Sequence, residues 1–160
     1  MHEVVGVLGE KLTNPWIHWL MGGFYRFAHP MLETNVFGIN FPNPIGLAAG
    51  FDKKARMLSL LPSLGFGFAE VGTVTPRPQE GNPKPRLFRL DQDAALINRM
   101  GFNNEGVDRV LLRLAGKPKD FILGINIGKN KDTPQELAWK DYEECFVKVS
   151  DLADLSLIHI

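Results

Sequence analysis

Hydrophobic residues near the start of the chain recur with the period of an α-helix. Apolar side chains stand three or four positions apart over residues 15–29, which places them on one helix face. Either Thr13 or Asn14 can cap this helix, and Pro15 suits its first position. The repeating residues are Trp16, Leu20, Phe24 and Phe27, with Trp19 beside them. Two interpretations remain open: the aromatic face packs on the main domain, or it dips into a membrane surface.

Short apolar runs in the middle of the chain predict strands. Residues 36–41, 65–75 and 121–128 are rich in β-branched and aromatic side chains. Residues 53–64, which precede the second run, carry leucines at helical spacing. This alternation of strand and helix is typical of the βαβ unit, so we expect an α/β fold with a parallel sheet.

Two more helices are predicted in the second half. Residues 105–114 follow a helical pattern that begins near the amides of the preceding loop. Thr133 can cap another helix, with Pro134 at its first position and Glu136 three residues after Thr133. This arrangement is a capping box. We expect that helix to run to about Val149.

Residues 76–104 form the longest stretch without a clear period, and loops this long are usually functional or disordered. The stretch leans basic, and its LFRL run from Leu87 can pair in a hairpin. It ends in NRMGFNN, residues 98–104, whose amides both donate and accept hydrogen bonds. Such a segment suits a ligand with alternating C=O and N–H groups, or it simply caps the next helix.

Small or polar residues stand where the predicted strands end. The stretch NPIGLAAGFDK, residues 43–53, places Ala48, Ala49 and Gly50 before Lys53. It suits a flat or anionic ligand on the strand end, or a tight turn with a solvated lysine. Thr73 and Asn126 end the next two strands. Because ligand sites of parallel folds lie at the carboxyl ends of strands, these residues should converge on one pocket.

Composition narrows the function classes only slightly. The chain has 160 residues, the usual size of one domain, and a formal net charge of zero, so nothing predicts a nucleic-acid partner. Its single cysteine, Cys145, excludes an internal disulfide framework and a cysteine-rich metal site, and we predict no metal.

Four long motifs, in this order and spacing, give the chain a specific resemblance. NPIGLAAGFDK, EVGTVTPRPQEGNPKPRLFRL, INRMGFNN and LGINIGKNKDTP resemble dihydroorotate dehydrogenase of the quinone-dependent, membrane-associated class. The resemblance covers roughly residues 36–154, and the aromatic N-terminal helix also resembles the helical extension of that class.

The resemblance implies a TIM (β/α)8 barrel that binds FMN at the carboxyl ends of its strands. It implies oxidation of dihydroorotate to orotate in pyrimidine (UMP) biosynthesis, with electrons passed to a membrane quinone. The N-terminal helix would face the membrane and line the quinone entry. Without a transit-peptide pattern, the expected location is the cytoplasmic side of a bacterial inner membrane, as a peripheral protein.

The resemblance also implies roles for individual residues. Ala48, Ala49 and Gly50 would lie along the flavin, and Thr73 and Asn126 would form hydrogen bonds with it. Lys53 would contact both substrate and flavin. The substrate pocket would be lined by Asn98, Arg99, Met100, Gly101 and Phe102.

The ends of the chain depart from the family pattern. We expect a helical extension at residues 1–34, the first βα units of a barrel truncated to about half at 35–154, and a non-native tail at 155–160. The tail, LSLIHI, is what a common sequencing-adaptor string encodes, although a genuine strand is the alternative. The catalytic serine base of the family would follow the C-terminus, so no catalytic residue is assigned and an inactive fragment is expected.

Two other functions stay open. The soluble class of the same family uses fumarate or NAD and lacks the aromatic extension. The second alternative is a non-catalytic module that binds flavin or a partner. Against this alternative, three βα units leave an open sheet edge that must be covered or paired.

Overall fold

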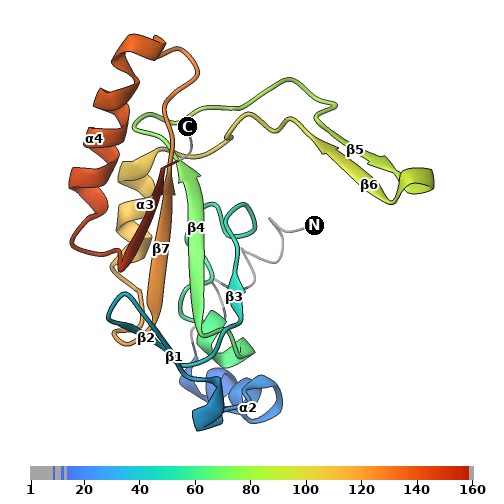
Figure 1. Cartoon of the computed structure of the whole chain (residues 1–160), viewed down its shortest axis with the longest axis vertical. Coiled ribbons are helices and arrows are strands. Elements are labelled where there is room, and N and C mark those ends of the chain that lie inside the picture. The colour runs from blue at the N-terminus through green and yellow to red at the C-terminus, as the bar shows by residue number, and fades with distance from the viewer. Residues whose placement is uncertain (1–8, 10–11, 13, 159–160) are drawn as a thin grey trace.

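A parallel sheet of four strands lies at the centre of the computed structural model, which describes residues 9, 12 and 14–158 (Figure 1). The strand order is β3-β4-β7-β8, and every neighbouring pair is parallel. The bounds are β3 Gly46–Leu47, β4 Phe68–Val74, β7 Ile122–Ile127 and β8 Leu155–Ile158. The predicted α/β class with a parallel sheet is confirmed.

The predicted strand over residues 121–128 is present as β7, and all six of its residues are buried. A continuous buried run is typical of a parallel strand covered on both faces. Leu123, Ile125 and Ile127 belong to the hydrophobic core, whereas Gly124 and Asn126 alternate with them and occupy the opposite face. The alternation therefore places the single amide of the strand away from the core.

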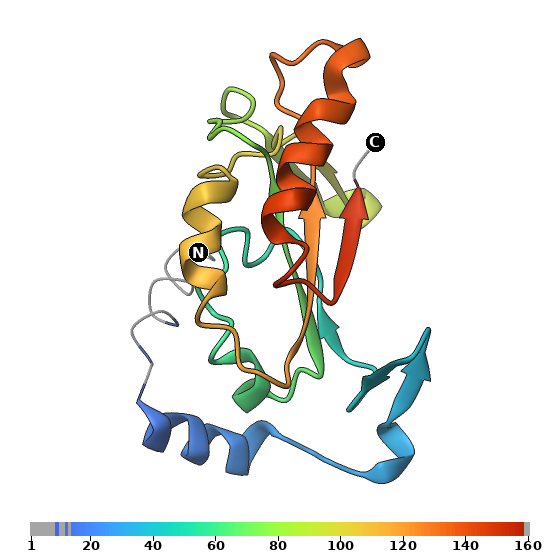
Figure 2. The ribbon, with the colours of Figure 1, turned by 90° about the vertical axis from the view of Figure 1, so that its left-hand side faces the viewer.

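Helices α3, Val107–Leu114, and α4, Ala138–Val149, cover one face of the sheet (Figure 2). Both were predicted, and both place their buried apolar residues in the hydrophobic core. The core side chains that they contribute are Val107, Val110, Leu114, Cys145 and Val149. The predicted capping box is wrong: the Thr133 hydroxyl donates to Asp141 Oδ2 at 2.7 Å, and a 3₁₀ turn at Gln135–Leu137 precedes α4.

The predicted helix over residues 53–64 is also wrong. The chain instead curls around Asp52, whose carboxylate accepts hydrogen bonds from the backbone N–H groups of Arg56 and Met57, both at 2.8 Å. Ala55 has a φ of +54°, which takes the backbone out of the right-handed helical region. Only a 3₁₀ turn at Leu61–Leu64 remains. The leucines are still buried in or against the core. Their spacing follows that burial, and it resembled the apolar stripe of a helix.

A two-stranded hairpin replaces the predicted strand over residues 36–41. Its strands are β1, Thr34–Val36, and β2, Ile39–Phe41, paired antiparallel. Phe37 and Gly38 form the turn with φ values of +52° and +82°, as a two-residue hairpin turn of this type requires. The apolar alternation continues through both strands, so the pattern alone did not locate the turn.

Helix α2, Pro15–Tyr25, confirms the first predicted helix, although it ends four residues earlier than expected. Asn14 is the cap, because its side-chain oxygen accepts a hydrogen bond from Trp16 N at 3.0 Å. The alternative cap, Thr13, lies outside the described residues, as does most of the N-terminal extension before it.

The long basic loop contains a second hairpin, which confirms the pairing expected at LFRL. Strands β5, Leu87–Leu90, and β6, Ala95–Asn98, are antiparallel and joined by a short 3₁₀ turn. The hairpin projects away from the sheet, on the side where β4 ends (Figure 1).

Candidate functional site

The predicted strand-end residues meet at one edge of the sheet. Gly50 N donates a hydrogen bond to the Gly72 carbonyl at 2.9 Å, which joins the turn after β3 to β4. Gly72 in turn lies opposite Asn126 in the register of β4 and β7. The ends of three neighbouring strands therefore form one continuous cluster, as expected for a parallel sheet.

The turn after β3 leaves room above its backbone. Gly50 has a φ of +96°, which favours glycine, and a Cβ built on it would meet no atom within 4 Å. The preceding Ala48 is exposed and Ala49 is half-buried. With methyl groups and a glycine along this edge, a flat group can approach the main chain closely.

A β-bulge turns the Thr73 side chain toward Asn126. The register of β4 and β7 shifts between Gly72 and Val74, so Thr73 is the extra residue on its strand. Its hydroxyl donates to Asn126 Oδ1 at 2.7 Å. Both side chains are nearly enclosed, with 7% of Thr73 and 3% of Asn126 exposed. Asn126 Nδ2 also donates to Glu70 Oε1 at 2.9 Å, and the sequence had not indicated this carboxylate.

Lys53 is oriented by a second amide. Its Nζ donates to Asn103 Oδ1 at 3.1 Å, which connects the turn after β3 to the NRMGFNN segment. Burial, and then the nearby positive charge of Arg86, lower the pKa of Lys53 below that of an ordinary lysine. Arg86 is itself fixed by donating to the carbonyls of Glu80 and Asn82. The site thus holds a half-buried cation beside an amide.

The predicted substrate segment, residues 98–102, runs from the projecting hairpin back to the sheet. Asn98 is exposed. Its Oδ1 accepts a hydrogen bond from Met100 N at 3.0 Å, so the amide folds back onto its own turn. The Gly101 and Phe102 carbonyls accept hydrogen bonds from Gln79 Nε2. Arg99 is exposed and its carbonyl accepts a hydrogen bond from the Asn82 side chain. The structure brings Asn103, rather than Asn98, to Lys53.

A buried polar network, formed by Thr75, Asn104, Asn130 and Asp141, holds the loops behind the cluster. Asn130 Oδ1 accepts from Arg77 N at 3.1 Å, and its amide nitrogen lies 3.1 Å from Thr75 Oγ1. Asn104 Nδ2 donates to Thr75 Oγ1, and Asp141 on α4 accepts from Asn130 N at 2.7 Å. Sequence reasoning missed Asn130 and Asp141; the amide directly after a strand-end Gly-Lys was the available signal.

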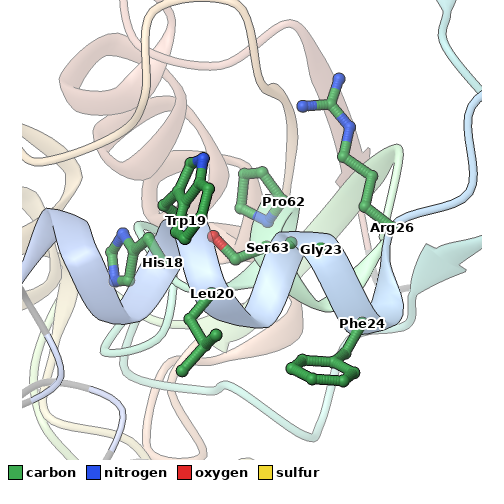
Figure 3. Close-up of a pocket in the computed structure, with 9 residues that line it drawn as sticks. His18, Trp19, Leu20, Gly23, Phe24, Arg26, Pro62 and Ser63 are labelled. Atoms are coloured by element: carbon green, nitrogen blue, oxygen red, sulfur yellow. The ribbon is translucent and has the colours of Figure 1, made fainter.

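The aromatic face of α2 is not packed on the described part of the chain. Trp16 is 77% exposed and Phe24 is 80% exposed, which excludes the core-packing interpretation for these side chains within the described residues. A shallow cavity of about 520 Å³ lies between α2 and the turn at Pro62 and Ser63, and the α2 residues that line it include Trp19, Leu20 and Phe24 (Figure 3). Helix α2 lies near the amino ends of the strands, away from the strand-end cluster (Figures 1 and 2).

Within the described residues, no group of three His, Cys, Asp or Glu side chains is placed to hold a metal ion. No helix in this part of the chain is both long and apolar enough to cross a membrane.

A parallel α/β sheet with amides, a hydroxyl and a lysine at its strand ends is the site arrangement of barrel and doubly wound enzymes. The protein-family model described as dihydroorotate dehydrogenase matches residues 31–160. The chain therefore belongs to the dihydroorotate dehydrogenase family.

Curated relatives agree with this assignment. A dihydroorotate dehydrogenase (quinone) from Xylella fastidiosa (strain 9a5c) is 59% identical over 134 residues, which are 82% of this chain and 38% of the relative. One of the same name from Gloeobacter violaceus is 48% identical over 99% of this chain and 44% of the relative. The chain thus spans less than half the length of these relatives.

A solved structure shows the same fold. The ligand-free DHODH from Eimeria tenella is 42% identical with a TM-score of 0.74, over 94% of this chain and 44% of that one. The DHODH of the same organism in complex with ferulenol gives 44% identity and a TM-score of 0.73.

Proposed function

We propose that this chain is part of a quinone-dependent dihydroorotate dehydrogenase, which oxidises dihydroorotate to orotate in pyrimidine (UMP) biosynthesis. The observation that carries the proposal is the strand-end cluster of Gly50, Thr73 and Asn126, with Lys53 three residues beyond Gly50. The four-stranded sheet would then be one portion of a TIM barrel. The names of the relatives at 48–59% identity support the quinone as electron acceptor.

The residues present fit FMN. The open space over Gly50 accommodates a flat ring, with Ala48 and Ala49 beside it. Thr73 and Asn126 supply hydrogen-bonding groups at a nearly enclosed edge, which suits the C=O and N–H groups of a flavin. When bound, FMN supplies the redox chemistry, and this chain's residues supply binding and orientation.

Lys53 suits the carboxylate of the substrate. Its ammonium group is half-buried, and a charge-assisted hydrogen bond in a partly dehydrated position is stronger than one in open water. Asn103 holds the ammonium in place, and the segment 98–102 would close the pocket from the hairpin side. We propose that the base that removes the substrate proton is a serine outside this chain.

We propose that α2 attaches the protein to a membrane as a peripheral element. Its exposed tryptophans and phenylalanine form the kind of apolar face that lies in a lipid interface. The electron acceptor would be a quinone in that membrane, at the cytoplasmic side of a bacterial inner membrane. The aromatic face favours this class over the soluble one that uses fumarate or NAD.

The test is dihydroorotate-dependent reduction of a quinone by the full-length protein that contains this chain. Lys53→Met should lower kcat/KM by about 100-fold, the cost of losing a charged partner of the substrate. Lys119→Met, an exposed lysine, is the matched control and should leave activity unchanged. Bound flavin without turnover would support the flavin-binding module instead, and turnover with fumarate but not quinone would support the soluble class.

A further inference from the structure

A directed row of hydrogen bonds crosses from β4 to β7 beneath the candidate cofactor site. Asn126 Nδ2 donates to Glu70 Oε1 at 2.9 Å, and the Thr73 hydroxyl donates to Asn126 Oδ1 at 2.7 Å. The row therefore begins at a carboxylate and ends at a hydroxyl beside Gly72, to which the Gly50 turn is bonded. Glu70 is the member that has no role in the proposed function so far.

The backbone of the two strands is shaped to admit this row. Glu70 lies opposite Gly124, and a Cβ on Gly124 would stand 3.3 Å from Cγ of Glu70, tighter than ordinary contact. Gly72 lies opposite Asn126, and a Cβ there would meet the Asn126 carbonyl at 2.5 Å. The bulge then brings Thr73 onto the same face as Glu70. Two glycines and one bulge thus leave space for three polar side chains.

The carboxylate sets the direction of every bond in the row. An ionised carboxylate only accepts hydrogen bonds, so the NH₂ group of Asn126 must face Glu70 and its oxygen must face Thr73. The Thr73 hydroxyl donates its only proton in a hydrogen bond to that oxygen. No other described residue donates a hydrogen bond to Thr73 Oγ1, so its lone pairs remain for a ligand.

We propose that Glu70 is a positioning residue that fixes the Asn126 amide and thereby makes Thr73 Oγ1 a hydrogen-bond acceptor for an N–H group of the bound flavin. Without the carboxylate, the amide can rotate and donate to Thr73. The hydroxyl would then point its proton at the ligand, where an N–H group repels it. The inference rests on the proposed function, because it assumes that the ligand at this edge is a flavin.

The experiment is FMN titration of the flavin-free full-length protein, followed by flavin fluorescence. Glu70→Gln keeps an acceptor for Asn126 and should bind FMN within about threefold of the unsubstituted protein, whereas Glu70→Met should bind about tenfold more weakly. Thr73→Val removes the acceptor and should show a similar loss. Because Glu70 acts through Thr73, adding Glu70→Met to Thr73→Val should cost less than about threefold more. Glu143→Met, on the exposed side of α4, is the control for loss of a carboxylate.

Four outcomes overturn the inference. Glu70→Met with unchanged FMN affinity would do so, and so would losses for Glu70→Met and Thr73→Val that simply add. If Glu70→Met does not fold, Glu70→Asp keeps a carboxylate that is too short to reach Asn126. It should then bind FMN about fivefold more weakly, and unchanged affinity would refute the role. Failure of the unsubstituted protein to bind FMN would overturn the proposed function itself and this inference with it.

Discussion

At the scale of single residues, the electrostatic setting of Lys53 gives the site a pH dependence. Burial and the charge of Arg86 lower its pKa, so the lysine loses its proton at a lower pH than a solvated one. The folded pKa lies below the unfolded one, and in the window between them the unfolded chain holds more protons. The free energy of unfolding therefore rises with pH across that window, and Lys53→Met should abolish this contribution.

If Lys53 binds the substrate carboxylate as proposed, the orotate affinity of the full-length protein should fall as pH rises through the lowered pKa of Lys53, because only the ammonium form attracts a carboxylate. Arg86→Gln removes the neighbouring charge and should move this fall to higher pH. Arg86→Lys keeps the charge and should leave its position unchanged. Titration of orotate binding between neutral and alkaline pH measures both variants. An unshifted curve for Arg86→Gln would show that Arg86 does not influence Lys53.

Cys145 shows the opposite effect of burial on a thiol. Its side chain is fully buried on α4, and burial, with Glu144 and Asp141 nearby, raises its pKa to about 12. At pH 8 the folded 160-residue chain should therefore react with a thiol reagent at least about 100-fold more slowly than the urea-unfolded chain. The absorbance of the released chromophore follows the reaction. Rapid labelling of one thiol in the folded chain would contradict the burial of this residue.

At the scale of elements, the buried network of Thr75, Asn104, Asn130 and Asp141 decides how firmly the strand-end loops are held. Removing the Asn130 amide would leave the backbone N–H of Arg77 without its hydrogen bond and would take one partner each from Thr75 Oγ1 and Gln79 Oε1. Asn130→Leu should lower the free energy of unfolding by about 2–3 kcal/mol. Asn40→Leu, on an exposed position of β2, is the control and should change it by less than about 0.5 kcal/mol. Urea denaturation of the 160-residue chain measures both, and equal stabilities would mean that the network contributes nothing.

Helix α2 provides a second test at this scale. If α2 attaches the protein to a membrane as proposed, replacing Trp16, Trp19 and Phe24 with glutamine should lower quinone reduction by the full-length protein at least about fivefold, since the helix would lose its apolar face. Dye reduction in solution should stay the same. Trp139→Gln, which changes an exposed tryptophan on α4, is the control for loss of an aromatic side chain. Equal losses with quinone and dye would mean that these side chains only support the fold.

The elements also show what a sequence pattern can predict. Helix α2 and strand β7 were located because a cap and a continuous apolar run are local signals. The turns at Phe37 and Ala55 were missed, because non-glycine residues with positive φ give no such signal. Their conformations depend on the surrounding tertiary structure.

The candidate site likewise contains contacts that the sequence predicted and contacts that it did not. The approach of Gly50 to Gly72, and of Gly72 to Asn126, follows from parallel strands whose ends meet. Glu70, and the contact of Asn103 with Lys53, were not predicted, because the partners stand about fifty residues apart in sequence and meet only through the exact register and the loop path.

At the scale of the whole molecule, the edge strands of the central sheet are β3 and β8, and within the described residues each pairs with a strand on one side only. All four residues of β8 are exposed, and Leu157 is 51% exposed. An uncovered strand can pair with another chain. The isolated 160-residue chain should therefore associate as its concentration rises, and Leu157→Lys should lower that association about tenfold. Sedimentation velocity over a concentration series measures this, and a monomer at every concentration would contradict it.

The order of strands in the sheet is also the order in which they are synthesised. Each of β4, β7 and β8 pairs with the sheet strand that precedes it along the chain. A nascent chain leaving the ribosome can therefore add each new strand to an edge that is already formed, without waiting for later residues. The hairpin of β5 and β6 closes on itself between two of these steps. The arrangement permits vectorial folding during translation, in which every intermediate presents one growing edge.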